Sequence, residues 1–484
     1  MGKTKFNTED LLYRQVADGL EKMISEDVLR IGDKLPSVRL LSDEYGISMG
    51  TAFQAYYHLE GKGLIESRPK SGYYVRFNFR KFPDLPDLVQ TQPLSHDVSV
   101  KEMIASIYSD IASPNDKVIN FALAVPDPSL LPIAKINKSV MHVLRKNKDA
   151  CIGYEHTQGN LELRKQVSRL AFNWGGKIKI DEIVITSGCL EAMTVCLRAV
   201  TRPGDTVAVE SPNYFGIFQA LESLGLKVVE IPTDFMNGLD IGALKLAIKK
   251  FSIKACVVVP NFNNPIGGCM PDESKKQLVD LITRHNIPLI EDDIYGELYF
   301  GKNRPRTCKY YDQAGLVMHC SSLSKSLAPG YRIGWTMPGK FIEEVKQIKR
   351  IHNISSPTIT QASMAHFLQH GRYEYHLKHL RKALHTQSLR YIQAIIDHFP
   401  GDTRVSRPHG GFVLWVGLNE KVNAFRLRTE AMKQNISLVP GKIFSATDAY
   451  DNFIRISFGK PFDKDAEYGL MMLGKLIKRM ENGK

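Results

Sequence analysis

The chain has 484 residues, more than one hydrophobic core usually organises, so we expect two or three globular domains. Its formal net charge of +13 suits a polyanionic partner such as DNA. Seven scattered cysteines without a C-x-x-C pair argue against a disulfide framework and a zinc site, and the lack of a signal-like start or a membrane-length apolar run favours the reducing cytoplasm.

Residues 8–78 are predicted to form a compact unit of three helices followed by two short strands. The first helix is expected to start at a Thr8 N-cap. Its inner face carries apolar residues at helical spacing: Leu12, Val16, Leu20 and Ile24. The third helix runs from about Ser48 to Lys62 and has an apolar face of its own: Ala52, Ala55, Tyr56 and Leu59.

The second helix lies between two tight turns. It opens at Ser37, ends at Gly46, and is expected to turn both Leu40 and Leu41 inward. The two strands after the third helix are joined by a basic turn, in the order Leu64–Ser67, Arg68–Ser71 and Gly72–Phe77. This pattern is that of a winged helix-turn-helix domain.

The chain between about Arg80 and Asp116 is predicted to be an irregular linker, with four prolines and a short helix near 100–111. Beyond it, strand-like runs alternate with helical segments, which is typical of an α/β fold with a mostly parallel sheet. The runs are Glu182–Thr186, Thr206–Glu210, Ala255–Pro260, Pro288–Glu291 and Val317–Ser321. The C-terminal part, with strands such as Gly411–Val416 and Phe453–Phe458, is expected to form a smaller α+β domain. We therefore predict three parts, 1–78, 79–115 and 116–484.

Polar residues follow the predicted strands in a fixed order. Ser187, Gly188 and Cys189 stand between a strand end and a helix, where free backbone N–H groups suit a phosphate. Further polar residues follow later strands: Tyr214, Asn264, Asp292, Tyr295, Ser322, Lys325, Arg332 and Arg455. Each alone is compatible with a structural role, but their order and combination indicate one site.

Residues from about Val118 to the end resemble a fold-type I aminotransferase that depends on pyridoxal 5′-phosphate (PLP). In that family the lysine of an S-x-x-K motif holds PLP as an internal aldimine, and Lys325 matches this lysine. Burial and the positive charge of Arg332 are expected to keep its amine neutral. The resemblance assigns Asp292 to the pyridinium nitrogen, Asn264 and Tyr295 to the ring hydroxyl, Tyr214 to the ring face, and Ser187, Gly188, Cys189, Ser322 and Arg332 to the phosphate.

The same resemblance implies a homodimer. Tyr154 matches the tyrosine that reaches the phosphate of the neighbouring subunit. Arg455 matches the arginine that grips a substrate carboxylate in a two-pronged contact, so the ligand is expected to be an amino acid or another amine with an acid group. No metal is expected.

Residues 11–78 resemble the GntR type of winged helix domain, through L-P-S-V-R before the second helix and G-Y-Y-V in the wing. The resemblance implies that the third helix enters the major groove of double-stranded DNA. The candidate DNA contacts are Arg39, Ser48, Met49, Thr51, Arg68 and Lys70. The chain departs from the family at Met49 and Gly50, where polar or basic residues often stand. Met49 and Phe53 either contact thymine methyl groups or pack within the domain.

A GntR-like head, a linker and an aminotransferase-like body resemble, in that order, the MocR group of bacterial transcription regulators. The resemblance implies a regulator whose DNA binding changes when an amino compound or PLP is bound. Two other functions stay open. One is a working aminotransferase with an accessory DNA-binding head, and the other is a DNA-binding protein whose body only dimerises.

Overall fold

The computed structural model describes residues 11–26, 28–29, 31–62, 64–68, 71–76, 83–86, 95–97, 118–146, 151–447 and 449–483. The chain divides into two compact units, Met1–Pro83 with Leu389–Asp397, and Asp84–Ser388 with His398–Lys484. Three predictions lie outside the described residues: the Thr8 cap, the helix near 100–111 and Lys70 in the wing turn.

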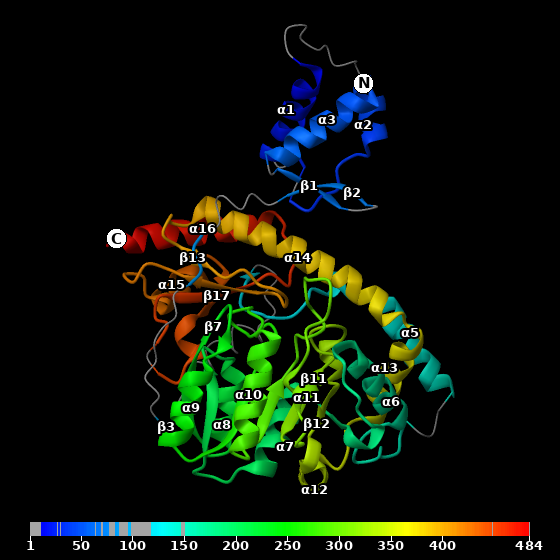
Figure 1. Ribbon diagram of the computed structural model, residues 1–484, viewed down its shortest axis with the longest axis vertical. Coiled ribbons are helices and arrows are strands. Elements are labelled where there is room, and N and C mark those ends of the chain that lie inside the picture. The colour runs from blue at the N-terminus through cyan, green and yellow to red at the C-terminus, as the bar shows by residue number, and fades with distance from the viewer. Residues whose placement is uncertain are drawn as a thin grey trace. The chain divides into compact units, whose positions relative to one another are not determined.

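The N-terminal unit has the predicted winged helix-turn-helix order (Figure 1). Its elements are α1 (Leu12–Ser25), α2 (Val38–Tyr45), α3 (Met49–Gly61), β1 (Ile65–Arg68) and β2 (Gly72–Val75), with β1 and β2 antiparallel. The Ser37 side chain caps α2 by accepting a hydrogen bond from the backbone N–H of Leu40 at 3.1 Å. Gly46 ends α2 in the left-handed region that favours glycine, with φ of 62°.

The core of this unit confirms the predicted face of α3. Its four apolar residues are fully buried: Ala52, Ala55, Tyr56 and Leu59. The prediction for α2 was half wrong, because Leu41 is buried but Leu40 is 49% exposed. Neighbouring residues of a helix lie about 100° apart, and α2 is short, so only one of the two leucines can point at the core.

A nine-stranded sheet organises the large part of the second unit. Its central strands β7, β6, β9, β10 and β11 are parallel, whereas β12 is antiparallel to its neighbours. In sheet order the strands are β3 (Ser95–Asp97), β7 (Lys227–Asp234), β6 (Thr206–Ser211), β9 (Ile253–Val258), β10 (Leu289–Asp292), β11 (Val317–Ser322), β12 (Gly334–Met337) and β5 (Val184–Thr186), and β8 (Gly238–Leu239) pairs with β7. The five predicted strands are confirmed, while β7, β12 and the linker strand β3 were not predicted.

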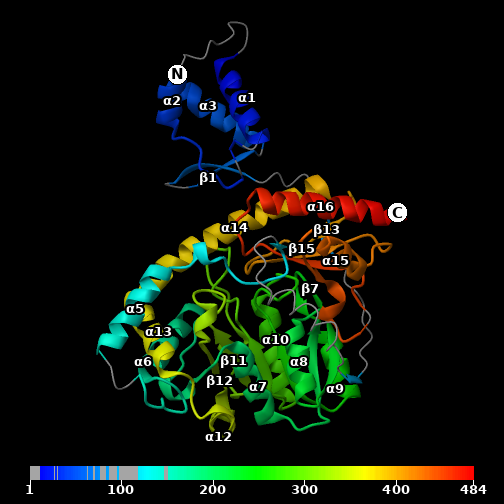
Figure 2. The same ribbon diagram turned by 180° about the vertical axis from the view of Figure 1, so that it is seen from behind.

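Helices cover both faces of this sheet, as the two opposite views show (Figures 1 and 2). Val207 and Val209 of β6 pack into one apolar cluster, and Ala208 between them packs into another on the other face. Both faces are therefore buried, which explains the apolar runs of the strands. The helices are α5 (Ile133–Lys146), α6 (Leu161–Ala171), α7 (Cys189–Val200), α8 (Phe215–Ser223), α9 (Ile241–Lys250), α10 (Asp272–Arg284), α11 (Cys308–Tyr311), α12 (Ile342–Asn353), α13 (Thr358–His370) and α14 (Tyr373–His398).

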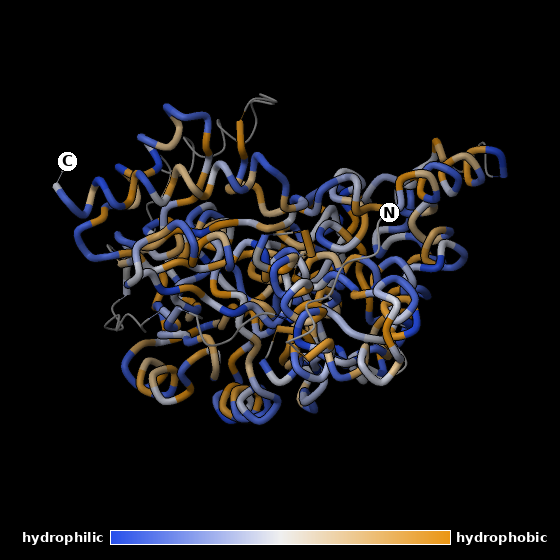
Figure 3. The backbone as a smooth tube through the Cα atoms, turned by 90° about the horizontal axis from the view of Figure 1, so that it is seen from above, coloured by the Kyte–Doolittle hydropathy of each residue, from blue (hydrophilic) through white to orange (hydrophobic). Residues whose placement is uncertain are grey.

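The C-terminal part is the predicted smaller α+β domain. Its sheet has the order β13 (Arg404–Val405), β14 (Val413–Gly417), β17 (Phe453–Ser457) and β16 (Val439–Pro440). A second small sheet pairs β4 (Ile119–Asn120) with β15 (Ile436–Ser437), and two helices complete the part, α15 (Ala424–Met432) and α16 (Lys464–Glu481). Apolar and polar stretches alternate along α16, whose apolar side is buried (Figure 3). Within the described residues, no helix is long and apolar enough to cross a bilayer.

Candidate functional site

A cavity of about 240 Å³ lies at the carboxyl ends of the parallel strands, where ligands of α/β folds usually bind. Eight of the residues predicted for the cofactor and its ligand line this cavity: Cys189, Tyr214, Asn264, Asp292, Tyr295, Lys325, Arg332 and Arg455. These residues come from positions as far apart as α7 and β17, so the fold brings together side chains that are distant in the sequence.

Four predicted residues do not line the cavity. Ser187, Gly188 and Ser322 lie beside it, where the Ser187 carbonyl accepts a hydrogen bond from Arg332 and the Ser322 hydroxyl accepts one from the backbone N–H of Ser324. The Tyr154 side chain is 87% exposed and does not reach the site of its own chain. The sequence prediction missed Ser324, which does line the cavity. The serine just before Lys325 in the S-L-S-K run was the signal that could have identified it.

Lys325 follows β11 and lines the cavity. Its Nζ donates a hydrogen bond to the backbone carbonyl of Ala124 at 2.6 Å. Burial of the amine, together with the nearby charges of Arg455 and Arg332, lowers the pKa of Lys325 to about 8. Far more of the amine is therefore neutral near pH 7 than in an ordinary lysine, and the neutral amine is the form that attacks a carbonyl carbon.

Asp292 ends β10 and turns its carboxylate into the cavity. The carboxylate accepts hydrogen bonds from the backbone N–H of Ile294 at 3.0 Å and from the thiol of Cys189 at 3.2 Å. Burial raises the pKa of Asp292 to about 6, although these hydrogen bonds oppose the shift. A cationic ligand group beside it would favour the ionised form.

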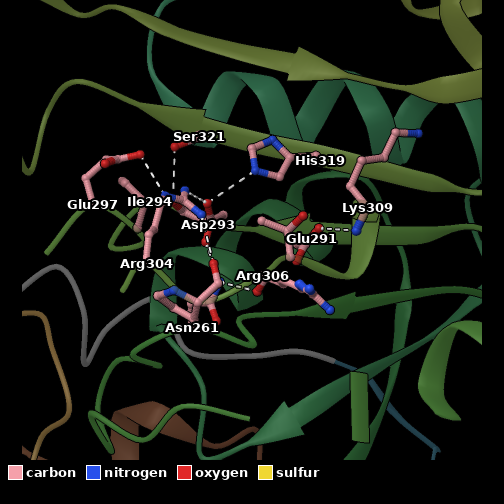
Figure 4. Close-up of polar contacts among 12 residues, drawn as sticks. Asn261, Glu291, Asp293, Ile294, Glu297, Arg304, Arg306, Lys309, His319 and Ser321 are labelled. Carbon is pink, nitrogen blue, oxygen red and sulfur yellow. Dashed lines mark hydrogen bonds and ion pairs between the residues drawn. The ribbon is translucent and has the colours of Figure 1, made fainter. Parts of the chain in front are cut away.

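The next residue, Asp293, points away from the cavity into a polar network behind it (Figure 4). Asn261 donates to Asp293 Oδ1 at 2.8 Å, and Arg304 forms ion pairs with Asp293 and with Glu297. Burial opposes ionisation of Asp293, but Arg304 and His319 outweigh it and hold the pKa of this carboxyl well below its usual range. The network fixes the backbone that carries Asp292.

Arg332 closes one end of the cavity. Its Nη2 donates to the backbone carbonyl of Ser187 at 3.0 Å, and its Nη1 donates to the hydroxyl of Ser324 at 3.1 Å. Gly188 has a φ of 98°, and a Cβ at this position would collide with the Arg332 guanidinium. Since α7 begins at Cys189, its free N–H groups face the same region, and the ensemble suits a phosphate.

Arg455 lies on β17, lines the same cavity and is buried. Its Nη2 donates to the backbone carbonyl of Ala122, and its Nη1 lies 3.4 Å from the side-chain oxygen of Asn264. Its Nε has no hydrogen-bond partner among the described residues. Burial lowers the pKa of Arg455 to about 10, which still leaves it a cation at neutral pH. A buried guanidinium with an unused donor suits a carboxylate.

The donor set fits PLP. Three cationic side chains, those of Lys325, Arg332 and Arg455, face a single cavity carboxylate, Asp292. This excess of positive charge matches a ligand that carries a phosphate at one end and meets a carboxylate at the other. Tyr214 adds an aromatic side chain to the lining of the cavity.

The candidate DNA contacts fall into three groups. Arg39 and Met49 are exposed. The Ser48 hydroxyl caps α3 by accepting from the backbone N–H of Thr51, and the Thr51 hydroxyl lies 2.8 Å from it. Arg68 is held on its own wing by an ion pair with Glu66 at 2.6 Å.

Comparison with known proteins supports both parts. The model of the aminotransferase class I and II family matches residues 117–470, and the model of the gntR family of bacterial regulatory proteins matches residues 12–75. The HTH-type transcriptional regulator YdcR of Escherichia coli (strain K12) is 37% identical over 468 residues, 96% of this chain and 99% of the relative.

Two solved structures resemble the C-terminal part. One is LysN, the α-aminoadipate aminotransferase of Thermus thermophilus, complexed with N-(5′-phosphopyridoxyl)-L-leucine. It has a TM-score of 0.72 and 25% identity, over 80% of this chain and 100% of that chain. The other is the kynurenine aminotransferase of Pyrococcus horikoshii, solved in complex with PMP. It has a TM-score of 0.73 and 27% identity, over 79% of this chain and 95% of that chain.

We expect the substitution Arg304→Met to destabilise the second unit. It leaves Asp293 and Glu297 without their buried cation, and loss of one partner of a buried pair costs about 3–5 kcal/mol. Thermal unfolding followed by circular dichroism measures this loss. As a control, Lys165→Met removes one partner of the exposed pair with Glu162 and is expected to cost less than about 1 kcal/mol. Equal effects of the two substitutions would contradict the role given to the network.

Proposed function

Because the chain belongs to the MocR type of transcriptional regulator, a gntR-family domain joined to an aminotransferase class I and II domain, we propose that it binds DNA under the control of PLP and a small amine. The observation that carries this proposal is the cavity in which Lys325, Asp292 and Arg455 meet. A gntR-family domain implies DNA binding, and an aminotransferase-type cavity implies an amino compound as ligand.

PLP, when bound, supplies an aldehyde and an electron-withdrawing ring. In our proposal Lys325 would hold the group through its Nζ, with the aldehyde oxygen leaving as water. Asp292 keeps a proton on the ring nitrogen, Asn264 and Tyr295 face the ring hydroxyl, and Arg332 with Ser324 and the start of α7 holds the phosphate. Burial of the lysine amine limits its contact with water and keeps it available in the neutral form.

The effector is proposed to carry both an amine and a carboxylate. Arg455 and Lys325 donate to the backbone carbonyls of Ala122 and Ala124, two residues of one short segment. A carboxylate at Arg455 would replace the weaker neutral acceptor by a charged one. The amine of the effector would lie beside Nζ of Lys325, which contacts the same segment. One molecule with both groups therefore acts on both cations.

We also propose that the protein works as a homodimer. Ile152 and Tyr154 are both 87% exposed in one loop, and the hydroxyl of Thr358, at the start of α13, donates to the carbonyl of Gly153 at 2.8 Å. Near α13, Ile351 and Ile354 are also exposed. Exposed apolar residues of this size favour a protein partner, and a second copy would let Tyr154 reach the other site.

A path for coupling starts where the linker meets the smaller domain. The backbone N–H of Val405 donates to the carbonyl of Asp84 at 3.0 Å. The next residues, Leu85 and Pro86, line a cavity of about 280 Å³ that Trp415 also lines. Linker residues 84–86 therefore contact the proposed effector domain, and we call this contact the linker seat.

Trp415 links the linker seat to Arg455, the arginine that we propose binds the effector. Trp415 on β14 is the cross-strand partner of Arg455 on β17, so their side chains lie side by side on one face of the sheet. The Phe444 ring contacts both, with its centroid 5.4 Å from that of Trp415 and 5.6 Å from the Arg455 guanidinium carbon. A ligand that prefers one arrangement of Arg455 can thereby bias the linker seat.

A working aminotransferase is the second candidate, and the complete donor set of the cavity favours it. The two functions differ in turnover. Conversion of bound PLP to pyridoxamine phosphate at rates typical of enzymes, about 1–1,000 per second, would support catalysis. A spectral change that saturates without turnover and alters DNA affinity supports regulation.

The proposed role of Lys325 predicts how PLP uptake depends on pH. Only the neutral amine reacts, so uptake by the apoprotein should rise with pH and level off above the pKa of about 8. Roughly a tenth of the amine is neutral one pH unit below the pKa and roughly nine-tenths one unit above it. Stopped-flow absorbance measures the rate. Arg455→Gln removes a neighbouring cation and should move the midpoint upward, and an unmoved midpoint would contradict the electrostatic account.

The proposed function is tested by titrating the holoprotein with a panel of amino acids and amines, with and without DNA from upstream of its own gene. We expect a cognate amino acid to change the visible absorbance and to change DNA affinity by about 5- to 150-fold. Lys325→Ala should abolish the absorbance change and the coupling while leaving the DNA-binding head folded. DNA affinity that stays constant across PLP and all amines would refute the sensing function.

The linker seat makes a separate prediction. The double substitution Leu85→Ala, Pro86→Ala should leave the absorbance titration with the amine unchanged. The amine should then no longer change the affinity for DNA. Fluorescence anisotropy of labelled DNA measures the coupling. Met236→Ala, at a 58% exposed residue of the same cavity, is the matched control and should keep the parental coupling. Parental coupling in the double variant would show that the signal takes another route.

A further inference from the structure

The outward face of α3 carries large apolar side chains and no cationic one. Its sequence, Met49–Gly61, contains no lysine or arginine. Met49, Phe53 and Tyr57 follow each other at intervals of four residues, which places them on one side of the helix. They are 54%, 52% and 70% exposed, respectively. A helix that is expected to enter the major groove thus presents large apolar side chains to it.

These side chains are not displaced members of the core. The inward face of α3 is complete, with Ala52, Ala55 and Leu59 fully buried and the Tyr56 hydroxyl donating to the carbonyl of Pro36 at 2.7 Å. The Phe53 ring meets the Tyr73 ring edge-on, with ring centroids 6.3 Å apart, and half of its side chain stays exposed. Packing within the domain therefore accounts for little of the apolar surface of α3.

The side-chain hydroxyl groups at the start of α3 already form hydrogen bonds within the helix. The Ser48 hydroxyl accepts a hydrogen bond from the backbone N–H of Thr51 at 3.0 Å and shares another with the Thr51 hydroxyl at 2.8 Å. Gly50 offers no side chain, although a Cβ there would meet only Ser48 Oγ at 3.7 Å. This leaves Met49 and Phe53, with the exposed Gln54 beside them, to face the bases.

Each base pair presents distinct chemistry in the major groove. Guanine is usually bound by the paired donors of arginine or lysine, adenine by the amide of glutamine or asparagine, and the thymine methyl by an apolar side chain. We propose that α3 reads A·T pairs, with Met49 and Phe53 on thymine methyl groups and Gln54 on adenine. This inference rests on the DNA binding proposed above and specifies which bases it recognises.

Affinity for the phosphates must then come from residues outside α3. Arg39, at the start of α2, is exposed and is a candidate for such a contact. A phosphate contact carries no base preference but adds to the salt dependence of binding. The two tasks are therefore assigned to different helices and can be separated by substitution.

The test uses the full-length holoprotein. Duplexes enriched from a random pool should contain A·T pairs in both half-sites. Replacing each enriched thymine by uracil removes only the methyl group, and loss of one buried methyl corresponds to about a fourfold loss of affinity. Phe53→Ala and Met49→Ala should each remove the difference between thymine and uracil at one position. Both residues are exposed, and thermal unfolding confirms that the variants stay folded.

Arg39→Gln is the control. It should weaken binding to the thymine and uracil duplexes equally and reduce the dependence on salt. Enrichment of G·C pairs, or equal affinity for thymine and uracil duplexes, would overturn the inference. So would concentration-dependent association of the protein that Phe53→Ala abolishes, because the apolar face would then bind a second head. Failure to enrich any duplex would instead refute DNA binding itself.

Discussion

The aminotransferase-type domain is organised around the placement of three cations and one carboxylate in a single cavity. Burying charge without compensation is costly, and the surrounding chain provides compensation from its backbone. Arg332 is held by the carbonyl of Ser187, Lys325 by that of Ala124, and Arg455 by that of Ala122. These carbonyls come from two segments, Ser187 before α7 and residues 122–124 after β4, so the charge of the cavity connects both of them with the end of β11 and the sheet that contains β17.

Strand β10 illustrates how one element serves two purposes. Successive side chains at the end of a strand point to opposite sides. Asp292 therefore faces the cavity while Asp293 forms the ion pair with Arg304 behind it. The chemistry of the site and the rigidity of its support are provided by adjacent residues with opposite pKa shifts, upward for Asp292 and downward for Asp293.

Much of this arrangement could be predicted from the sequence, because strand ends and glycines have local signatures. Lys325, Arg332 and Asp292 were identified from their order after apolar runs, and the caps of α2 and α3 from single serines. Contacts between distant segments could not be predicted in this way. Arg304 lies in a loop without a motif, and the pairing of β3 with β7 depends on a tertiary contact. Leu40 was misplaced because composition does not reveal which of two adjacent leucines points inward.

The linker strand β3 has a consequence for how the second unit can be isolated. Ser95–Asp97 pairs antiparallel with β7 at the edge of the nine-stranded sheet. A bare edge strand offers unpaired N–H and C=O groups to other chains and is a common start of aggregation. A fragment that begins at residue 116 would lose this cover and leave the apolar strand β7 as the edge. Ser95–Asp97 is therefore part of the fold of the second unit, although composition alone marks this segment as a connector.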